Sequence, residues 1–205
     1  MSKRPTKKNW RDAHRQDPYV IKAQQQGYRS RAVFKLEEID QRHKLLRSGM
    51  STIELGAAPG GWCQYVSQRT SPNGKLLAVD LLPMNPVDQV DIIQGDATEQ
   101  AVFEEMIKWT NQQKLDAVLS DMAPDLTGIR STDQARSFYL IEIAVDTAVK
   151  LLKPDGFLLY KGFNGHEFQN IVKQTRRHFE TIKIEKPKAS RDYSSEVYVL
   201  ARKLK

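Results

Sequence analysis

The stretch Glu-Leu-Gly-Ala-Ala-Pro-Gly-Gly-Trp at residues 54–62 decides the fold of this chain. The segment that leads into it, 51–55, predicts a strand, and the pattern at 62–70 predicts a helix. The glycines and the proline at 56–61 are typical of a tight turn. The sequence therefore predicts a strand, a turn of small residues and a helix in this order.

The same alternation continues along the chain and favours a mainly parallel, doubly wound sheet. One more helix is expected from about Ser30, ahead of the first strand, because Ser is a common N-cap and apolar residues follow it with a helical spacing. The further strands are expected at 75–80, 91–94, 115–120, 156–161, 181–186 and 197–202, and the further helices at 99–112, 132–152 and 166–178.

The last two expected strands are joined by a short segment without a helical pattern, residues 187–196. A parallel crossover needs a dozen residues or more, so this pair should be antiparallel. The predicted fold class is therefore α/β: a Rossmann-like sheet of seven strands, mostly parallel, with an antiparallel last strand.

Positive charge is concentrated at the N-terminus. Residues 1–35 hold ten Lys and Arg against two Asp, whereas the whole chain has a net charge of +7. Such a block attracts polyanions through phosphate contacts, and Trp10, Tyr19 and Tyr28 among the charges could stack on bases. A solvated tail is the alternative. We expect a basic arm at 1–29 that contacts RNA and is partly disordered, followed by one domain at 30–205.

Composition excludes several other classes of protein. No apolar run approaches the roughly 18 residues of a membrane span. Cys63 is the only cysteine, so no intramolecular disulfide can form, and the four histidines have no metal-ligand spacing with it. The basic N-terminus lacks the apolar stretch of a secretory signal. We expect a cytoplasmic protein without a metal site, and monomeric by default.

The turn at 56–61 is a candidate ligand site. Its small residues allow close approach of a ligand, which could be a nucleotide, a phosphate or the amino-acid end of S-adenosylmethionine. Asp80 ends the second expected strand, where an acid can accept hydrogen bonds from ribose hydroxyls. Asp96 follows the third strand and could meet an adenine. Each acid alone is more often a turn-former, but the three features together form a specific pattern.

Four charged residues are expected at the same edge of the sheet. Asp121 follows the fourth strand, Lys161 ends the fifth, Glu196 begins the antiparallel last strand, and Lys35 lies on the helix before the first. A lysine can take a proton from a weak acid such as a ribose 2′-hydroxyl if a like charge or burial lowers its pKa. The two carboxylates would orient the ammonium groups but oppose that shift. The alternative is a set of surface salt bridges.

Six segments of the chain together resemble the FtsJ/RrmJ (RlmE) family of heat-shock methyltransferases, and the resemblance runs from about Tyr19 to Arg202. It implies a Rossmann-like methyltransferase that uses S-adenosylmethionine. The bacterial members methylate a uridine 2′-hydroxyl in the A-loop of 23S ribosomal RNA. The segments are 28–36, 55–62, 80–84, 94–96, 120–124 and 190–198.

The resemblance also implies a role for each candidate residue, with Lys161 as the leading proton acceptor of a catalytic tetrad. The tetrad is Lys35, Asp121, Lys161 and Glu196. The implied cofactor contacts are Gly60, Trp62, Asp80, Asp96 and Asp121. For Trp62, packing of the ring under the first helix is favoured over stacking on the cofactor.

Two positions depart from the family pattern. Glu54 stands where the family usually has Asp, and its longer side chain should shift a contact with the methionine end of the cofactor. Gly162 stands where a β-branched residue is expected, which should loosen the end of that strand. Neither departure removes a member of the tetrad, so activity is expected.

Three functions remain open. The first is methylation of 23S ribosomal RNA, with RNA in or near the assembled 50S subunit as partner. The second is 2′-O-methylation of transfer RNA or of messenger RNA caps. The third is a non-catalytic ribosome-assembly factor that binds RNA, against which the intact tetrad argues.

Overall fold

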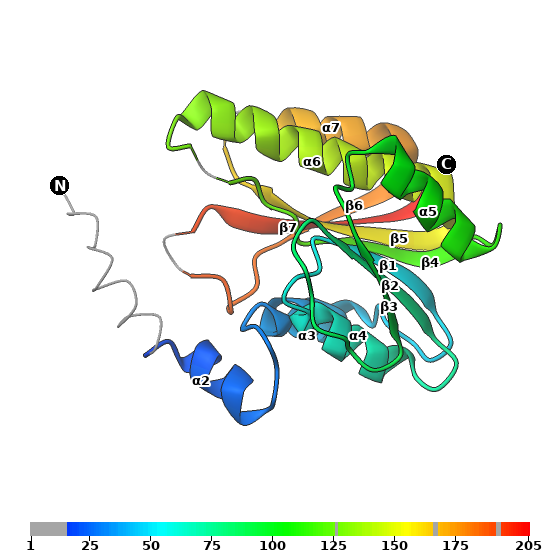
Figure 1. Cartoon of the computed structure of the whole chain (residues 1–205). Helices are drawn as coiled ribbons and strands as arrows, with labels where there is room; N and C mark the ends of the chain where they lie inside the picture. Colours follow the sequence, from blue (N-terminus) through cyan, green and yellow to red (C-terminus); the bar gives the residue numbers. More distant parts are fainter. Residues whose placement is uncertain (1–15, 126, 166–167, 192–193) are drawn as a thin grey trace.

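The computed structural model describes residues 16–125, 127–165, 168–191 and 194–205, and contains a seven-stranded sheet flanked by helices (Figure 1). The strands lie in the order β3-β2-β1-β4-β5-β7-β6. β7 runs antiparallel to both of its neighbours, β5 and β6, and every other pairing is parallel. The strands are β1 (Ser51–Leu55), β2 (Lys75–Asp80), β3 (Val90–Gln94), β4 (Leu115–Ser120), β5 (Leu152–Phe163), β6 (Phe179–Glu185) and β7 (Glu196–Leu204).

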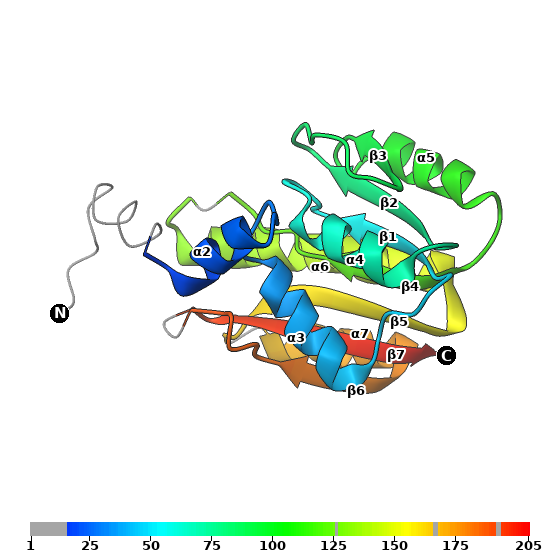
Figure 2. The ribbon, with the colours of Figure 1, turned by 90° about the horizontal axis from the view of Figure 1, so that it is seen from below.

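Helices cover both faces of the sheet: α3 and α4 lie on one face, and α5, α6 and α7 on the other (Figure 1). A further helix, α2, lies at the end of the sheet near the start of α3 (Figure 2). The helices are α2 (Pro18–Gln25), α3 (Val33–His43), α4 (Gly61–Thr70), α5 (Gln100–Thr110), α6 (Arg130–Leu151) and α7 (Phe168–His178).

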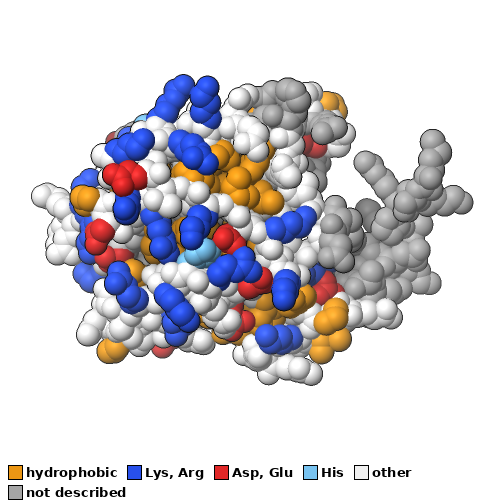
Figure 3. Space-filling view, turned by 180° about the vertical axis from the view of Figure 1, so that it is seen from behind, with side chains coloured by type: hydrophobic (Ala, Val, Ile, Leu, Met, Phe, Trp, Pro, Cys, Tyr) orange, Lys and Arg blue, Asp and Glu red, His pale blue; other side chains and the backbone are white. Residues whose placement is uncertain are grey.

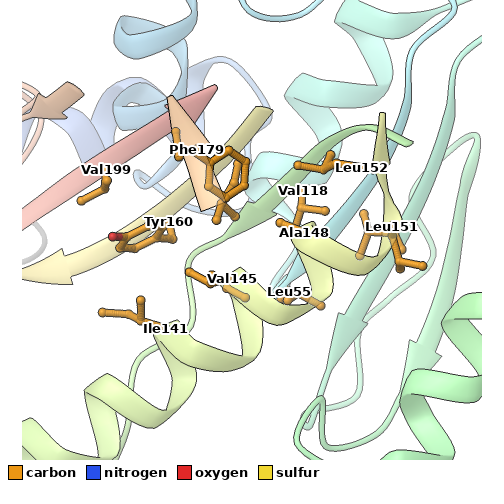
Figure 4. Close-up of a cluster of buried hydrophobic side chains, with 14 of the residues drawn as sticks. Leu55, Val118, Ile141, Val145, Ala148, Leu151, Leu152, Tyr160, Phe179 and Val199 are labelled. Atoms are coloured by element: carbon orange, nitrogen blue, oxygen red, sulfur yellow. The ribbon is translucent and has the colours of Figure 1, made fainter. Parts of the chain in front are cut away.

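The core consists of two apolar layers, one on each face of the sheet. Successive side chains of a strand point to opposite faces, so Leu76 and Ala78 pack towards α3 and α4, whereas Leu77 and Val79 pack on the other side. Figure 4 shows part of that second layer, in which side chains of α6 meet those of β4, β5 and β6. Because both faces are covered, most side chains of the central strands are buried.

The predicted fold class is confirmed, including the antiparallel last strand. β1, β2 and β4 have the expected bounds, whereas β5 begins four residues earlier than the expected 156–161 and ends two residues later. This topology places the carboxyl ends of β1, β2, β4 and β5 and the start of β7 at one edge of the sheet, which we call the rim.

The helix α2 was not predicted, because residues 1–29 show no clear helical period. Asp17 caps it by accepting a hydrogen bond from the backbone N–H of Tyr19 at 3.0 Å, and Pro18 occupies its first turn. Ala23 is buried, and the ring of Tyr19 lies 5.7 Å from that of Phe34 on α3. The segment from Asp17 therefore packs on the domain. The RNA contact of the arm stays a prediction, and its residues 1–15, with Trp10 and His14, lie outside the described residues.

None of the helices in the described part of the chain has both the length and the apolarity needed to cross a membrane.

Candidate functional site

The glycine turn lies at the centre of the rim and closes tightly on the segment after β4. Gly56 has a φ of +76°, and a Cβ atom there would lie 2.7 Å from the backbone nitrogen of Met122. Its N–H donates to the carbonyl of Val79 at 2.9 Å, which fixes the turn against β2. Gly60, with a φ of +102°, precedes the first residue of α4. Only glycine satisfies the first of these positions without displacing backbone.

Asp80 links the glycine turn to the loop that follows β2. Its Oδ2 accepts a hydrogen bond from the N–H of Ala58 at 2.8 Å, and its Oδ1 accepts one from the N–H of Leu82 at 2.8 Å. Its backbone carbonyl accepts from the N–H of Gly95 at 2.9 Å, which brings Asp96 to the same part of the rim. The Oδ1 of Asp96 caps its own turn at the N–H of Thr98, 2.9 Å away. Both acids lie at the rim, and their contacts with a cofactor stay predictions.

Trp62 is a packing residue. Its side chain is buried, its Nε1 donates to the carbonyl of Ala32 at 2.8 Å, and its ring lies 5.7 Å from that of Tyr198. The indole thus joins α4 to the start of α3 and to β7, in agreement with the expected packing role. A cofactor contact through the backbone of Trp62 stays a prediction.

The four predicted tetrad residues meet at the rim as two ion pairs. Lys35 Nζ lies 2.6 Å from Glu196 Oε1, and Lys161 Nζ lies 3.1 Å from Asp121 Oδ1. Lys161 Nζ also donates to the backbone carbonyl of Asp121 at 2.5 Å. The Lys161 side chain is only 9% exposed and that of Lys35 14%, so neither pair is a loose surface contact. The structure therefore does not support the alternative of independent surface salt bridges.

Tyr198 joins the two ion pairs and was missed by sequence reasoning. Its hydroxyl donates to Asp121 Oδ1 at 2.8 Å, and Lys35 Nζ lies 6.0 Å from the centre of its ring. Burial, and then the charges of Asp121 and Glu196, raise the pKa of Tyr198 well above its usual range, so it stays a hydrogen-bond donor. The available signal was its position two residues after Glu196, on the same face of β7.

Two serines hold Glu196 and were also missed. Ser190 Oγ donates to Glu196 Oε1 at 3.1 Å, and the N–H of Glu196 donates to Ser194 Oγ at 3.2 Å. Both lie in the segment between β6 and β7. This segment therefore fixes the carboxylate that Lys35 contacts.

Glu54 is buried behind the glycine turn, next to Cys63. Cys63 Sγ donates to Glu54 Oε2 at 3.0 Å. Burial raises the pKa of Glu54 to about 8 against the opposing effect of this hydrogen bond, and the charges of Asp121 and Asp80 add to the rise. Burial, followed by the charge of Glu54, also raises the pKa of Cys63, which makes the thiol unreactive.

Gly162 lies near the end of β5, where it pairs with Val197 of β7. A Cβ atom at this position would lie 2.9 Å from Cε2 of Phe168, the buried first residue of α7. The ring fills the volume that a side chain would take. The expectation of a loosened strand end stays a prediction, although the aromatic ring of α7 occupies the space beside this glycine.

Comparisons with known proteins fit this arrangement. The family described as FtsJ-like methyltransferase matches residues 28–204. The chain belongs to this FtsJ-like methyltransferase family. It is therefore a methyltransferase, and the expected family, enzyme class and S-adenosylmethionine cofactor are confirmed.

Relatives of this FtsJ-like methyltransferase match it along nearly the whole chain. Proteins named ribosomal RNA large subunit methyltransferase E are 48% identical in Legionella pneumophila (strain Corby) and 49% identical in Azoarcus sp. (strain BH72), each alignment covering 98% of both chains. A Plasmodium falciparum protein provisionally described as a ribosomal RNA methyltransferase has a TM-score of 0.78 and 26% identity, covering 86% of this chain and 98% of that one. The fold is also similar to that of Aeropyrum pernix fibrillarin, solved with bound S-adenosyl-L-methionine, with a TM-score of 0.52, 14% identity, and coverage of 77% of this chain and 68% of that one.

Proposed function

We propose that this methyltransferase transfers a methyl group from S-adenosylmethionine to a uridine ribose 2′-hydroxyl in 23S ribosomal RNA, in the A-loop of the 50S subunit. The observation that carries the proposal is the pair of lysines, each held by a carboxylate, beside a glycine turn at the rim. The names of the full-length relatives support the large ribosomal subunit as the source of the substrate. The cytoplasm is the proposed location, because ribosomes are the proposed target.

The residues of the rim fit the cofactor. The turn at 56–61 has no side chain larger than proline, and Asp80 presents a carboxylate next to it. We assign the methionine end to Gly60 and the backbone of Trp62, the ribose to Asp80, the adenine to Asp96, and a contact near the sulfonium to Asp121. When bound, the cofactor supplies an activated methyl group on a sulfonium centre.

Lys161 is the proposed base. A ribose 2′-hydroxyl is a poor nucleophile, so its proton must leave at or before methyl transfer. In this assignment Lys161 Nζ would accept that proton, and the 2′-oxygen would take the methyl group that the cofactor supplies. Asp121 orients the amine through its carboxylate and its carbonyl, and Tyr198 holds that carboxylate.

Lys35 and Glu196 position the acceptor ribose in this proposal. Their side chains form an ion pair at 2.6 Å, and Lys35 Nζ lies 6.0 Å from the centre of the Tyr198 ring. A fixed ammonium and a fixed carboxylate beside the reacting hydroxyl supply hydrogen-bond partners to neighbouring ribose oxygens. Correct alignment of the two reactants lowers the barrier by removing rotational freedom before the chemical step.

The N-terminal arm is the proposed RNA contact, with 1–29 as the arm and 30–205 as the catalytic domain. Figure 3 shows Lys and Arg side chains mixed with acidic and apolar ones on one face of the domain. The net positive excess lies instead in the first 35 residues. Neutralising Lys7, Lys8, Arg11 and Arg15, which lie outside the described residues, should weaken RNA binding and flatten its salt dependence. Unchanged RNA affinity would show that the arm is a solvated tail that does not contact RNA.

The decisive experiment mixes the protein, labelled S-adenosylmethionine and 50S particles that lack the modification. Label is expected at one uridine 2′-oxygen. Lys161→Ala should abolish transfer while cofactor binding persists. Lys153→Ala is the matched control: this lysine lies on the same strand and is paired with Asp116 at 2.7 Å, and its removal should leave the rate unchanged.

Other outcomes would identify a different function. Label on a base would refute 2′-O-methylation. Methyl transfer to free transfer RNA or to capped messenger RNA, but never to ribosomal subunits, would identify one of those RNAs as the substrate. Binding of particles without any transfer would favour a non-catalytic assembly factor. Sedimentation of the RNA-free protein as a dimer would overturn the proposed monomer.

A further inference from the structure

Arg29 lies on the segment between α2 and α3, and its guanidinium reaches two loops of the rim. Its Nη1 donates to the carbonyl of Asn85 at 2.7 Å and to that of Pro59 at 3.3 Å. Its Nη2 donates to the carbonyl of Pro86 at 2.6 Å. Pro59 belongs to the glycine turn, whereas the other two acceptors belong to the loop that follows β2. One side chain thus ties these two loops together.

The backbone of Arg29 is itself fixed on α4. Its N–H donates to Gln64 Oε1 at 2.8 Å, and Gln64 Nε2 donates to the carbonyl of Gly27 at 2.9 Å. The neighbouring ring of Tyr28 contacts that of Phe34 edge-on, with 6.1 Å between centres. The guanidinium therefore extends from an anchored point, which is what a bridging side chain needs.

Asp80 connects the same two loops at a second point. One of its carboxylate oxygens accepts from Ala58 in the glycine turn, and the other accepts from Leu82 in the following loop. The loops are also packed where they meet. A Cβ atom on Gly60 would lie 3.0 Å from Nη1 of Arg29 and 3.1 Å from the sulfur of Met84.

We propose that Arg29 is a positioning residue for the cofactor: it holds the loop at 81–87 against the glycine turn, so that Asp80 keeps the orientation needed to bind the cofactor ribose. The inference rests on the proposed assignment of the cofactor to Asp80 and this turn. Arg29 has no contact with the reacting atoms in this role and acts through the two loops.

The competing role for Arg29 is a phosphate contact, because it is exposed and lies in the basic N-terminal part of the chain. The hydrogen bonds argue against it. Both terminal nitrogens already donate to backbone carbonyls, in a planar fork that matches acceptors from two loops. An ammonium is a point charge and cannot reproduce this arrangement. The two roles therefore predict different behaviour of a lysine at this position.

The test compares Arg29→Lys and Arg29→Gln with a matched control, Lys22→Gln, which removes an exposed charge on α2. Calorimetry measures the Kd for S-adenosylhomocysteine without RNA, and steady-state assays measure KM for S-adenosylmethionine and kcat. Both Arg29 variants should raise the Kd and the KM about tenfold, the effect of losing charge-assisted hydrogen bonds to carbonyls. The kcat at saturating cofactor and the Kd for RNA should stay at wild-type values.

The control should leave cofactor binding unchanged. If Arg29→Lys binds cofactor as the wild type does, or if the Arg29 variants lose RNA affinity and salt dependence instead, the inference is overturned. Asp80→Asn, measured in parallel, tests the assignment beneath it. Undiminished cofactor binding by Asp80→Asn would refute the proposed site itself, whereas weakened binding by Asp80→Asn alone would refute only the role of Arg29.

Discussion

Glu54→Gln should remove a large part of the pH dependence of this protein's stability. Glu54 is 1% exposed, and its contact is the thiol of Cys63. Burial raises its pKa from the ordinary 4.5 to about 8 in the folded protein. Glutamine is nearly isosteric with the protonated acid and cannot ionise. The variant therefore keeps the shape of the wild-type side chain and removes its titration.

The sign and size of the effect follow from proton linkage. Between pH 4.5 and about 8 the folded protein holds a proton on Glu54 that the unfolded chain has released. The free energy of unfolding therefore falls as pH rises, by about 1.4 kcal/mol per pH unit. From about pH 5.5 to about pH 7.5 the wild type should lose roughly 2 to 3 kcal/mol from this group alone. The Gln variant should lose none of it.

Urea unfolding at a series of pH values measures this difference directly. The gap between the two proteins should widen in favour of Glu54→Gln as pH rises, with equal m-values. Glu180→Gln is the matched control, because Glu180 is a largely exposed residue, and its curve should run parallel to that of the wild type. Parallel curves for wild type and Glu54→Gln would show that Glu54 is ionised in the folded protein and would refute the reasoning.

Three further substitutions test the rim and its support. Tyr198→Phe should lower kcat at least about tenfold, because one hydrogen bond to the charged Asp121 contributes about 1.5–3 kcal/mol, and a wild-type rate in the methyl-transfer assay would contradict this. Gly56→Ala places a Cβ atom 2.7 Å from the backbone nitrogen of Met122. Calorimetry should therefore show that cofactor binding is lost, and thermal unfolding should show a lower Tm. Normal cofactor binding would show instead that the turn can adapt to the side chain. Asp40 Oδ1 accepts hydrogen bonds from the backbone N–H groups of Leu45 and Leu46, after α3, at 2.9 and 2.8 Å. Asp40→Ala removes this acceptor and should lower the free energy of unfolding by about 3 kcal/mol. A urea midpoint equal to that of the wild type would contradict this prediction.

The order of strands and the position of the tetrad were predictable because they depend on local patterns and on topology. Apolar runs of strand length alternate with helical patterns, and the carboxyl ends of parallel strands must share an edge. This is enough to bring Lys161 and Asp121 together from two different strands. The short connection before β7 requires this strand to run antiparallel, which places Glu196 at the same edge of the sheet.

Features that depend on tertiary packing were not predictable. The helix α2 has no strong periodicity and is stabilised by contacts with Phe34, which lies outside it. The effect of Gly162 depends on the ring of Phe168, six residues further along. Arg29 looked like one more cation of the basic arm, since nothing in its neighbourhood in the sequence indicates carbonyl acceptors more than fifty residues away at Asn85 and Pro86.

The position of β7 between β5 and β6 has a consequence for the order in which the rim can form. Although β7 follows the other six strands along the chain, it inserts between β5 and β6 and brings Glu196 and Tyr198 to the rim. A chain in which β7 has not yet paired has a gap in its sheet between β5 and β6, and its rim lacks Glu196. The rim is therefore complete only when this strand is in place, so the site cannot assemble from a partly folded sheet.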